Sequence, residues 1–204
     1  MTRVAVFGGS FNPPHIGHAL VIQWLLWSGE VDQVIIVPSE GHPLKKDPPA
    51  DIEVRHTMLV GMAEQDLGAT QDAHLYRGYV PASHSRVIVS RVEHDMPKPA
   101  YTYDMLTKLK KRLPPDWELN LVVGTDILAE SDRWYKWDAL VKEFGLILVG
   151  RSGYDAKTEH PVFPSISSTE IRKMMAEGDP AWKKLVTPSV RALLERNLPA
   201  YPLG

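Results

Sequence analysis

The stretch Gly8-Gly9-Ser10-Phe11-Asn12-Pro13-Pro14-His15-Ile16-Gly17-His18 decides how this sequence folds. The mostly apolar run at residues 3–7 before it is typical of a short buried strand, which the glycines end. Residues 17–27 after it have the apolar spacing of a helix, and residues 34–37 form a second apolar run, stopped by Pro38. A strand, a glycine turn, a helix and another strand in this order predict a βαβ unit and therefore a parallel sheet.

The rest of the chain continues this alternation. We expect strands at residues 86–92, 119–123 and 146–149, and helices at residues 54–65, 103–113, 134–144, 168–177 and 189–197. With no repeat or low-complexity linker, the pattern predicts one domain over residues 1–204. Its fold class is α/β, with a doubly wound, mostly parallel sheet and a small helical C-terminal part. In such a sheet, ligands bind outside the carboxyl ends of the strands.

Composition excludes several classes of protein. The net charge is -2, so the sequence offers no bulk electrostatic attraction for nucleic acid or for an anionic membrane. The chain has no cysteine, which excludes disulfides, thiolate metal sites and cysteine nucleophiles. No apolar run approaches the roughly 18 residues of a membrane helix, and the N-terminus lacks the pattern of a signal peptide. We therefore expect a cytoplasmic protein that binds neither nucleic acid nor membrane; the sequence allows a homo-oligomer without requiring one.

The glycines and histidines of the first turn have the chemistry of a phosphate site. Glycine lets the backbone approach a phosphate closely, and the unpaired N–H groups at a helix N-terminus point at it. His15 and His18 are three residues apart across the predicted helix start, so their side chains share one face and both could donate to phosphate oxygens. A zinc site would need further ligands, and the glutamate of a His-Glu-x-x-His motif is absent. We therefore name no metal-binding residue.

A segment near the C-terminus has a related character. In Ile166-Ser167-Ser168-Thr169-Glu170-Ile171-Arg172, Ser167 and Glu170 have the spacing of a capping box, so a helix should begin here. A cap followed by a surface arginine can be purely structural. The functional alternative is a second helix N-terminus aimed at phosphate, with Arg172 neutralising the charge.

Both segments resemble the His-x-Gly-His nucleotidyltransferase superfamily. Residues 11–15 are similar to its nicotinate-mononucleotide adenylyltransferase branch, and residues 166–172 are similar to that family's Ile-Ser-Ser-Thr-x-Ile-Arg motif at every defined position. The resemblance implies a Rossmann-like nucleotidyltransferase fold. It implies an enzyme of NAD biosynthesis that joins ATP and nicotinate mononucleotide to deamido-NAD and pyrophosphate, by direct in-line transfer without a covalent enzyme intermediate. It also implies that Mg²⁺ accompanies ATP.

The resemblance and the predicted strand ends together assign the ATP site. The catalytic groups are His15, His18, Arg172 and a lysine of the loop after the second strand, either Lys45 or Lys46. The ATP-binding residues are Gly8, Gly9, Ser10, Phe11, Gly17, Gly124, Asp126, Arg151, Ile166, Ser167, Ser168 and Thr169.

The second substrate is assigned to residues in four parts of the chain. The mononucleotide-binding residues are Asn12, Arg55, Thr102, Thr125 and Trp134. The resemblance implies that Trp134 stacks on the pyridine ring, although a tryptophan in such a segment is more often part of the core. The chain departs from the family at Ala100, where relatives have a serine, and in the lysine loop, which lacks their Pro-Pro-His-Lys form.

Three alternatives remain open from the sequence. Nicotinamide mononucleotide, the amide, could be the main substrate in place of the acid. Another enzyme of the superfamily would use phosphopantetheine or an alcohol phosphate as acceptor, and a nucleotide-binding regulator would keep the site without turnover. Residues 68–85 have no role that the sequence supports.

Overall fold

A parallel sheet forms the centre of the computed structural model, which describes residues 1–40, 50–69, 74–75, 86–125, 131–152, 161–197 and 201–203. Its strand order is β3-β4-β2-β1-β5-β6-β7, and every described pair of strands runs parallel. The strands are β1 (Thr2–Gly9), β2 (Gln33–Pro38), β3 (His74–Leu75), β4 (Val87–Ser90), β5 (Trp117–Gly124), β6 (Gly145–Arg151) and β7 (Val162–Phe163).

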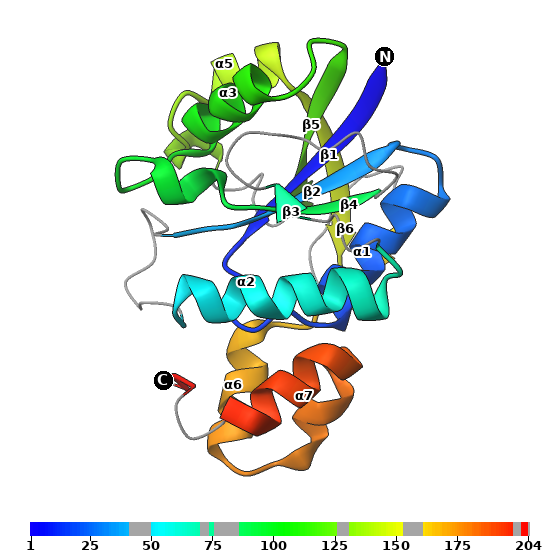
Figure 1. Ribbon diagram of the computed structural model, residues 1–204, viewed down its shortest axis with the longest axis vertical. Helices are drawn as coiled ribbons and strands as arrows, with labels where there is room; N and C mark the ends of the chain where they lie inside the picture. The colour runs from blue at the N-terminus through cyan, green and yellow to red at the C-terminus, as the bar shows by residue number, and fades with distance from the viewer. Residues whose placement is uncertain are drawn as a thin grey trace.

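Helices cover both faces of this sheet (Figure 1). They are α1 (Ile16–Trp27), α2 (Ile52–Gly61), α3 (Thr102–Arg112), α5 (Trp137–Glu143), α6 (Ser168–Ala176) and α7 (Pro188–Asn197). Shorter helical turns are η1 (Met62–Asp66), which continues α2, η2 (Val92–Asp95), η3 (Ser131–Arg133) and η4 (Pro180–Lys184). α3 and α5 lie on one face, α1 and α2 on the other, and α6 and α7 form a helical part packed against α2.

The two faces of the sheet bury two separate apolar clusters. Along β1, Ala5 belongs to the cluster under α1, α2, α6 and α7, whereas its neighbours Val4 and Val6 belong to the cluster under α3 and α5. All three are fully buried. This alternation follows from the pleat of a strand, and burial on both faces explains why the strands read as continuous apolar runs.

The strand order reverses direction at the centre of the sheet. From β1 the chain moves outward through β2 to β3 at the edge, continues with β4 beside β2, and then places β5 on the other side of β1. Val6 of β1 lies beside Leu121 of β5, so both strands end three residues later, at Gly9 and Gly124. Ligands of doubly wound sheets bind outside the carboxyl ends of the strands at such a reversal of direction.

The fold class predicted from the sequence is confirmed, and the differences are local. The expected helix at residues 134–144 begins only at Trp137, because Lys136 has a left-handed backbone conformation (φ 55°) that a helix interior does not tolerate. α2 begins at Ile52, earlier than expected, because the Asp51 carboxylate accepts a hydrogen bond from the Glu53 N–H. A loop with a short strand was expected within residues 68–85, where β3 lies, whereas the short strand β7 and the turn η4 were not predicted.

None of the helices in these ranges has the length and apolar composition needed to cross a membrane.

Candidate active site

The turn after β1 has a strained conformation that its surroundings hold in place. Phe11 has a left-handed backbone (φ 47°), which is unfavourable for a bulky residue. Its ring is 2% exposed and packs edge-on against the rings of Phe7 and His18, with centroid distances of 5.6 and 4.8 Å. A Cβ at Gly9 would come within 3.2 Å of the Phe11 ring, so the glycine is needed for this packing. One at Gly8 would meet no described atom within 4 Å, so the end of β1 borders open space.

The two histidines at the start of α1 stack on each other. Their ring centroids are 3.6 Å apart and their planes differ by 24°. The backbone N–H of His15 donates to Nδ1 of His18 (3.1 Å), so the proton of the neutral His18 ring is on Nε2. A Cβ at Gly17 would lie 3.1 Å from the His15 ring, so this glycine makes room for the histidine itself. His18 therefore presents an N–H donor at the beginning of a helix.

The second segment is bound directly to the first turn. Ser168 Oγ donates to the carbonyl of Pro13 (2.9 Å), and Arg172 Nη1 donates to the carbonyl of Asn12 (2.7 Å). Ser167 caps α6 as predicted, since its side chain accepts a hydrogen bond from the Glu170 N–H (3.1 Å). The N-terminal ends of α1 and α6, far apart in the sequence, thus meet at one place, where helix dipoles and N–H groups favour an anion.

Two further residues of the second segment, Ile166 and Thr169, lie close to the N-terminal ends of α1 and α6. Ile166 is half-buried and its Cβ lies 3.8 Å from a Cβ built at Gly17, whereas Thr169 is exposed in the first turn of α6. Ser10 lies in the turn itself and is half-buried.

A buried arginine holds the other side of the turn. Arg55 on α2 is 1% exposed; its Nε donates to the carbonyl of Ala50 (2.7 Å) and its Nη1 to the carbonyl of Ser10 (2.8 Å). Burial lowers the pKa of this guanidinium from its ordinary value. Asn12 is 7% exposed, and its side-chain Oδ1 accepts hydrogen bonds from the Ala50 N–H (3.2 Å) and from the Tyr201 hydroxyl (2.7 Å). The described contacts of Arg55 therefore support the backbone of the turn after β1.

An acidic pair lies beyond the carboxyl ends of β2 and β4. Glu93 Oε2 accepts a hydrogen bond from the Glu40 N–H (2.9 Å), and the Glu40 carboxylate pairs with His94 Nδ1 (3.1 Å) and with Lys98 Nζ. Burial raises the pKa of Glu93 to about 7. This network joins Glu40 to residues 93–98, the segment that leads into α3.

The residues predicted to bind the mononucleotide come from neighbouring strand and helix ends. Thr102 begins α3 and is half-buried, and Thr125, 9% exposed, follows Gly124 at the end of β5. Trp134 is half-buried after η3, and its ring meets that of Trp137 edge-on at 5.7 Å. One edge of Trp134 thus packs in the core while part of it remains accessible.

Three predicted residues, Lys45, Lys46 and Asp126, lie outside the residues that the structure describes. Arg151 ends β6 at the same edge of the sheet as Gly9 and Gly124. Within the described ranges, no group of three or more His, Asp or Glu side chains is arranged to hold a metal ion.

Sequence reasoning missed Tyr201 as a partner of Asn12, and it missed the contact between Glu40 and Glu93. Glu93 follows a buried strand, which hinted at the carboxyl edge of the sheet, but no local pattern pointed to Glu40. Tyr201 contacts a residue 189 positions earlier, and no spacing rule covers such a distance.

Comparison with known proteins identifies the family. Residues 6–174 match the family model described as cytidylyltransferase-like. The chain is 34% identical over 177 residues to a probable nicotinate-nucleotide adenylyltransferase of Anaeromyxobacter dehalogenans, which covers 87% of this chain and 86% of the relative. It is 27% identical over 203 residues to the nicotinate-nucleotide adenylyltransferase of Bacillus subtilis, covering 97% of each.

These matches show that the chain belongs to the nicotinate-nucleotide adenylyltransferases within the cytidylyltransferase-like family. The family resemblance inferred from the two sequence segments is thereby confirmed. A solved structure of Plasmodium falciparum nicotinic acid mononucleotide adenylyltransferase complexed with NaAD has the same fold, with a TM-score of 0.76 at 19% identity over the full length of both chains.

Proposed function

We propose that this protein transfers the adenylyl group of ATP to nicotinate mononucleotide, giving deamido-NAD and pyrophosphate. The observation that carries the proposal is the junction of the two helix N-termini through Arg172 and Ser168. Two helix ends, an arginine and two stacked histidines form a donor-rich place near the carboxyl end of β1, which suits a triphosphate. Relatives that cover most of the chain are named for this activity.

The chemistry requires no proton transfer by the protein. A phosphate oxygen of the mononucleotide attacks the α-phosphorus of ATP, a new P–O bond forms there, and the bond from the α-phosphorus to the bridging oxygen breaks. The electron pair leaves with pyrophosphate. Because the nucleophile is already an anion, catalysis consists of positioning and of neutralising charge on the transferring group.

We assign the donor groups of the two segments to different phosphates of ATP. His18, with its proton on Nε2, stabilises the α-phosphate as it becomes five-coordinate, and His15 orders the ring of His18 by stacking on it. Arg172, Ser167 and Thr169 bind the β and γ phosphates with their side chains, and Ser168, whose hydroxyl donates to the Pro13 carbonyl, contributes its backbone N–H. Gly8 leaves the end of β1 open for the nucleotide, and Gly9 makes room for the Phe11 ring at the same turn.

The other predicted residues complete the two substrate pockets. Lys45 or Lys46 closes over the triphosphate, while Gly124, Asp126 and Arg151 contact the nucleotide. Thr102, Thr125 and Trp134 bind the mononucleotide, with the pyridine ring stacked on the accessible part of Trp134. Arg55 acts by holding the carbonyl of Ser10, which makes it a positioning residue.

Mg²⁺ would enter with ATP and would neutralise part of the negative charge of the triphosphate. The side chains at the helix junction are neutral or positive donors, which bind phosphate oxygens and leave the cation to the substrate. The absence of cysteine fits a reducing compartment, so we infer that the enzyme works in the cytoplasm.

A pyrophosphate-release assay tests the proposal. The purified protein is given ATP and Mg²⁺ with nicotinate mononucleotide, with nicotinamide mononucleotide, with phosphopantetheine or with no acceptor. We expect release with the two pyridine mononucleotides and a higher kcat/KM for the acid. Release only with phosphopantetheine would refute the acceptor, and ATP binding without release would favour the regulator. The His18→Ala variant controls for contaminating activity.

A further inference from the structure

A tyrosine from the end of the chain reaches the active-site turn. Tyr201 is 5% exposed, and its hydroxyl donates to Oδ1 of Asn12 at 2.7 Å. We propose that Tyr201 is a positioning residue that fixes the orientation of the Asn12 carboxamide and thereby the affinity for the mononucleotide. The inference rests on the proposed function, in which Asn12 binds that substrate.

The contacts of Asn12 determine which way its amide points. The backbone N–H of Ala50 can only donate, so the side-chain atom that faces it at 3.2 Å must be the oxygen Oδ1. The Tyr201 hydroxyl donates to the same oxygen, which occupies both of its lone pairs. The Nδ2 amide group consequently points away from both donors, and its two N–H bonds are presented on the opposite side of the carboxamide.

Tyr201 is suited to be a permanent donor. Burial raises the pKa of its hydroxyl, and the positive charges of Arg172 and Arg55 oppose this rise without cancelling it. The hydroxyl therefore stays protonated throughout the physiological range. The hydroxyl and Arg172 both bind Asn12, one at the side-chain oxygen and the other at the backbone carbonyl.

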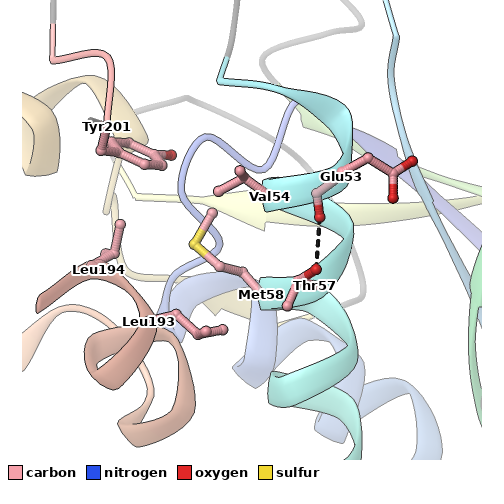
Figure 2. A pocket seen from close by; sticks show the side chains of 7 residues that line it. All are labelled: Glu53, Val54, Thr57, Met58, Leu193, Leu194 and Tyr201. Atoms are coloured by element: carbon pink, nitrogen blue, oxygen red, sulfur yellow. Dashed lines mark hydrogen bonds between the residues drawn. The ribbon is translucent and has the colours of Figure 1, made fainter. Parts of the chain in front are cut away.

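The ring of Tyr201 has a separate, structural role. It borders a small apolar hollow of about 190 Å³ between α2 and α7, together with Val54, Met58 and Leu194 (Figure 2). This hollow is too small for a nucleotide, since sites for drug-sized ligands usually exceed about 300 Å³. The ring thus packs with the helices while the hydroxyl serves the active site, and a phenylalanine at this position separates the two roles.

The kinetic experiment compares Tyr201→Phe with Tyr103→Phe. The control, Tyr103→Phe, also removes a tyrosine hydroxyl. That hydroxyl donates to the Glu143 carboxylate (2.9 Å) in an exposed pair. For Tyr201→Phe we expect KM for nicotinate mononucleotide to rise about tenfold, as loss of one oriented hydrogen bond predicts, while KM for ATP and kcat change less than about twofold. Tyr103→Phe should match the wild type. Equal rises in both KM values, or no rise in either, would overturn the inference.

A double-mutant cycle shows whether Tyr201 acts through Asn12. If it does, adding Tyr201→Phe to Asn12→Ala will raise KM for the mononucleotide no further than Asn12→Ala alone. Additive effects would overturn the inference, because they would show that Tyr201 acts by another route.

A spectroscopic measurement decides the same point without turnover. In ¹⁵N-labelled protein, the side-chain amide signals of Asn12 are those lost in Asn12→Ala. We expect these signals to shift or broaden in Tyr201→Phe and to stay in place in Tyr103→Phe; unchanged signals in Tyr201→Phe would refute the orienting contact. If the wild type released no pyrophosphate, the proposed function would fail, whereas the amide signals would still show whether Tyr201 orients Asn12.

Discussion

Replacing Glu93 by glutamine removes a carboxylate that is buried at the edge of the sheet. Glu93 is 7% exposed, and the groups facing it are Glu40, Lys98 and Arg55, with His94 bound to the Glu40 carboxylate. Burial raises the pKa of Glu93 from 4.5 to about 7; the charge of Glu40 adds to this rise, and Lys98 and Arg55 oppose it. Glutamine keeps an oxygen that can accept the Glu40 N–H and has no charge to bury.

The raised pKa sets the sign of the effect on stability. Between pH 4.5 and about 7 the folded protein holds a proton on Glu93 that the unfolded chain has lost. The contribution of this group is therefore fully present below pH 4.5, falls as the pH rises to about 7, and stays low above that. A gap of about 2.5 pH units, at about 1.4 kcal/mol for each unit, corresponds to about 3.5 kcal/mol in the free energy of unfolding.

Urea denaturation at pH 5 and pH 8 measures this contribution. We expect Glu93→Gln to be more stable than the wild type at pH 8, and its advantage at pH 8 to exceed that at pH 5 by about 2–3 kcal/mol. Glu118→Gln, at an exposed position of β5, controls for the loss of one negative charge. If the stabilities of Glu93→Gln and the wild type changed with pH in parallel, the buried carboxylate would not titrate as argued.

Three further substitutions test other parts of the site. For His18→Ala we expect kcat to fall by about 10² to 10⁴ with an unchanged circular dichroism spectrum, and near-normal turnover would exclude the assigned role. Trp134→Ala should raise KM for nicotinate mononucleotide and leave KM for ATP nearly unchanged; equal rises would argue against ring stacking. Arg55→Leu leaves the carbonyls of Ser10 and Ala50 without their donor, so we expect a loss of roughly 2–5 kcal/mol in urea denaturation. A loss below about 0.5 kcal/mol would show that water replaces the guanidinium.

The features that sequence predicted best depend on neighbours along the chain. The turn at Gly8 and Gly9 is set by a strand and a helix that adjoin it, and the start of α6 is set by Ser167 and Glu170 within one turn. Hydrophobic runs likewise identified the central strands, because burial on both faces leaves a continuous apolar pattern. These local rules were sufficient for the fold class and for the two helix starts at which we propose that phosphate binds.

Contacts between distant residues were not predictable in this way. Arginine is a residue type that usually lies at the surface. Only the fold reveals that Arg55 is buried and bound to the carbonyl of Ser10, 45 residues earlier. The Glu40–Glu93 contact joins the ends of two strands that are neighbours in the sheet and 53 residues apart in sequence. The predicted beginning of α5 was wrong because Lys136 has a left-handed backbone conformation, which its residue type does not reveal.

The contacts between the first turn and the C-terminal part of the chain have a consequence during synthesis of the protein. Asn12 is held by Arg172, 160 residues later, and by Tyr201, 189 residues later. At roughly 5–20 residues per second, a ribosome needs about 10 to 40 s between synthesising Asn12 and Tyr201. During that interval the nascent chain has its glycine turn without the partners that fix it. Chains released early, before Arg172, should therefore lack a working triphosphate site, so that incomplete products of translation do not consume ATP.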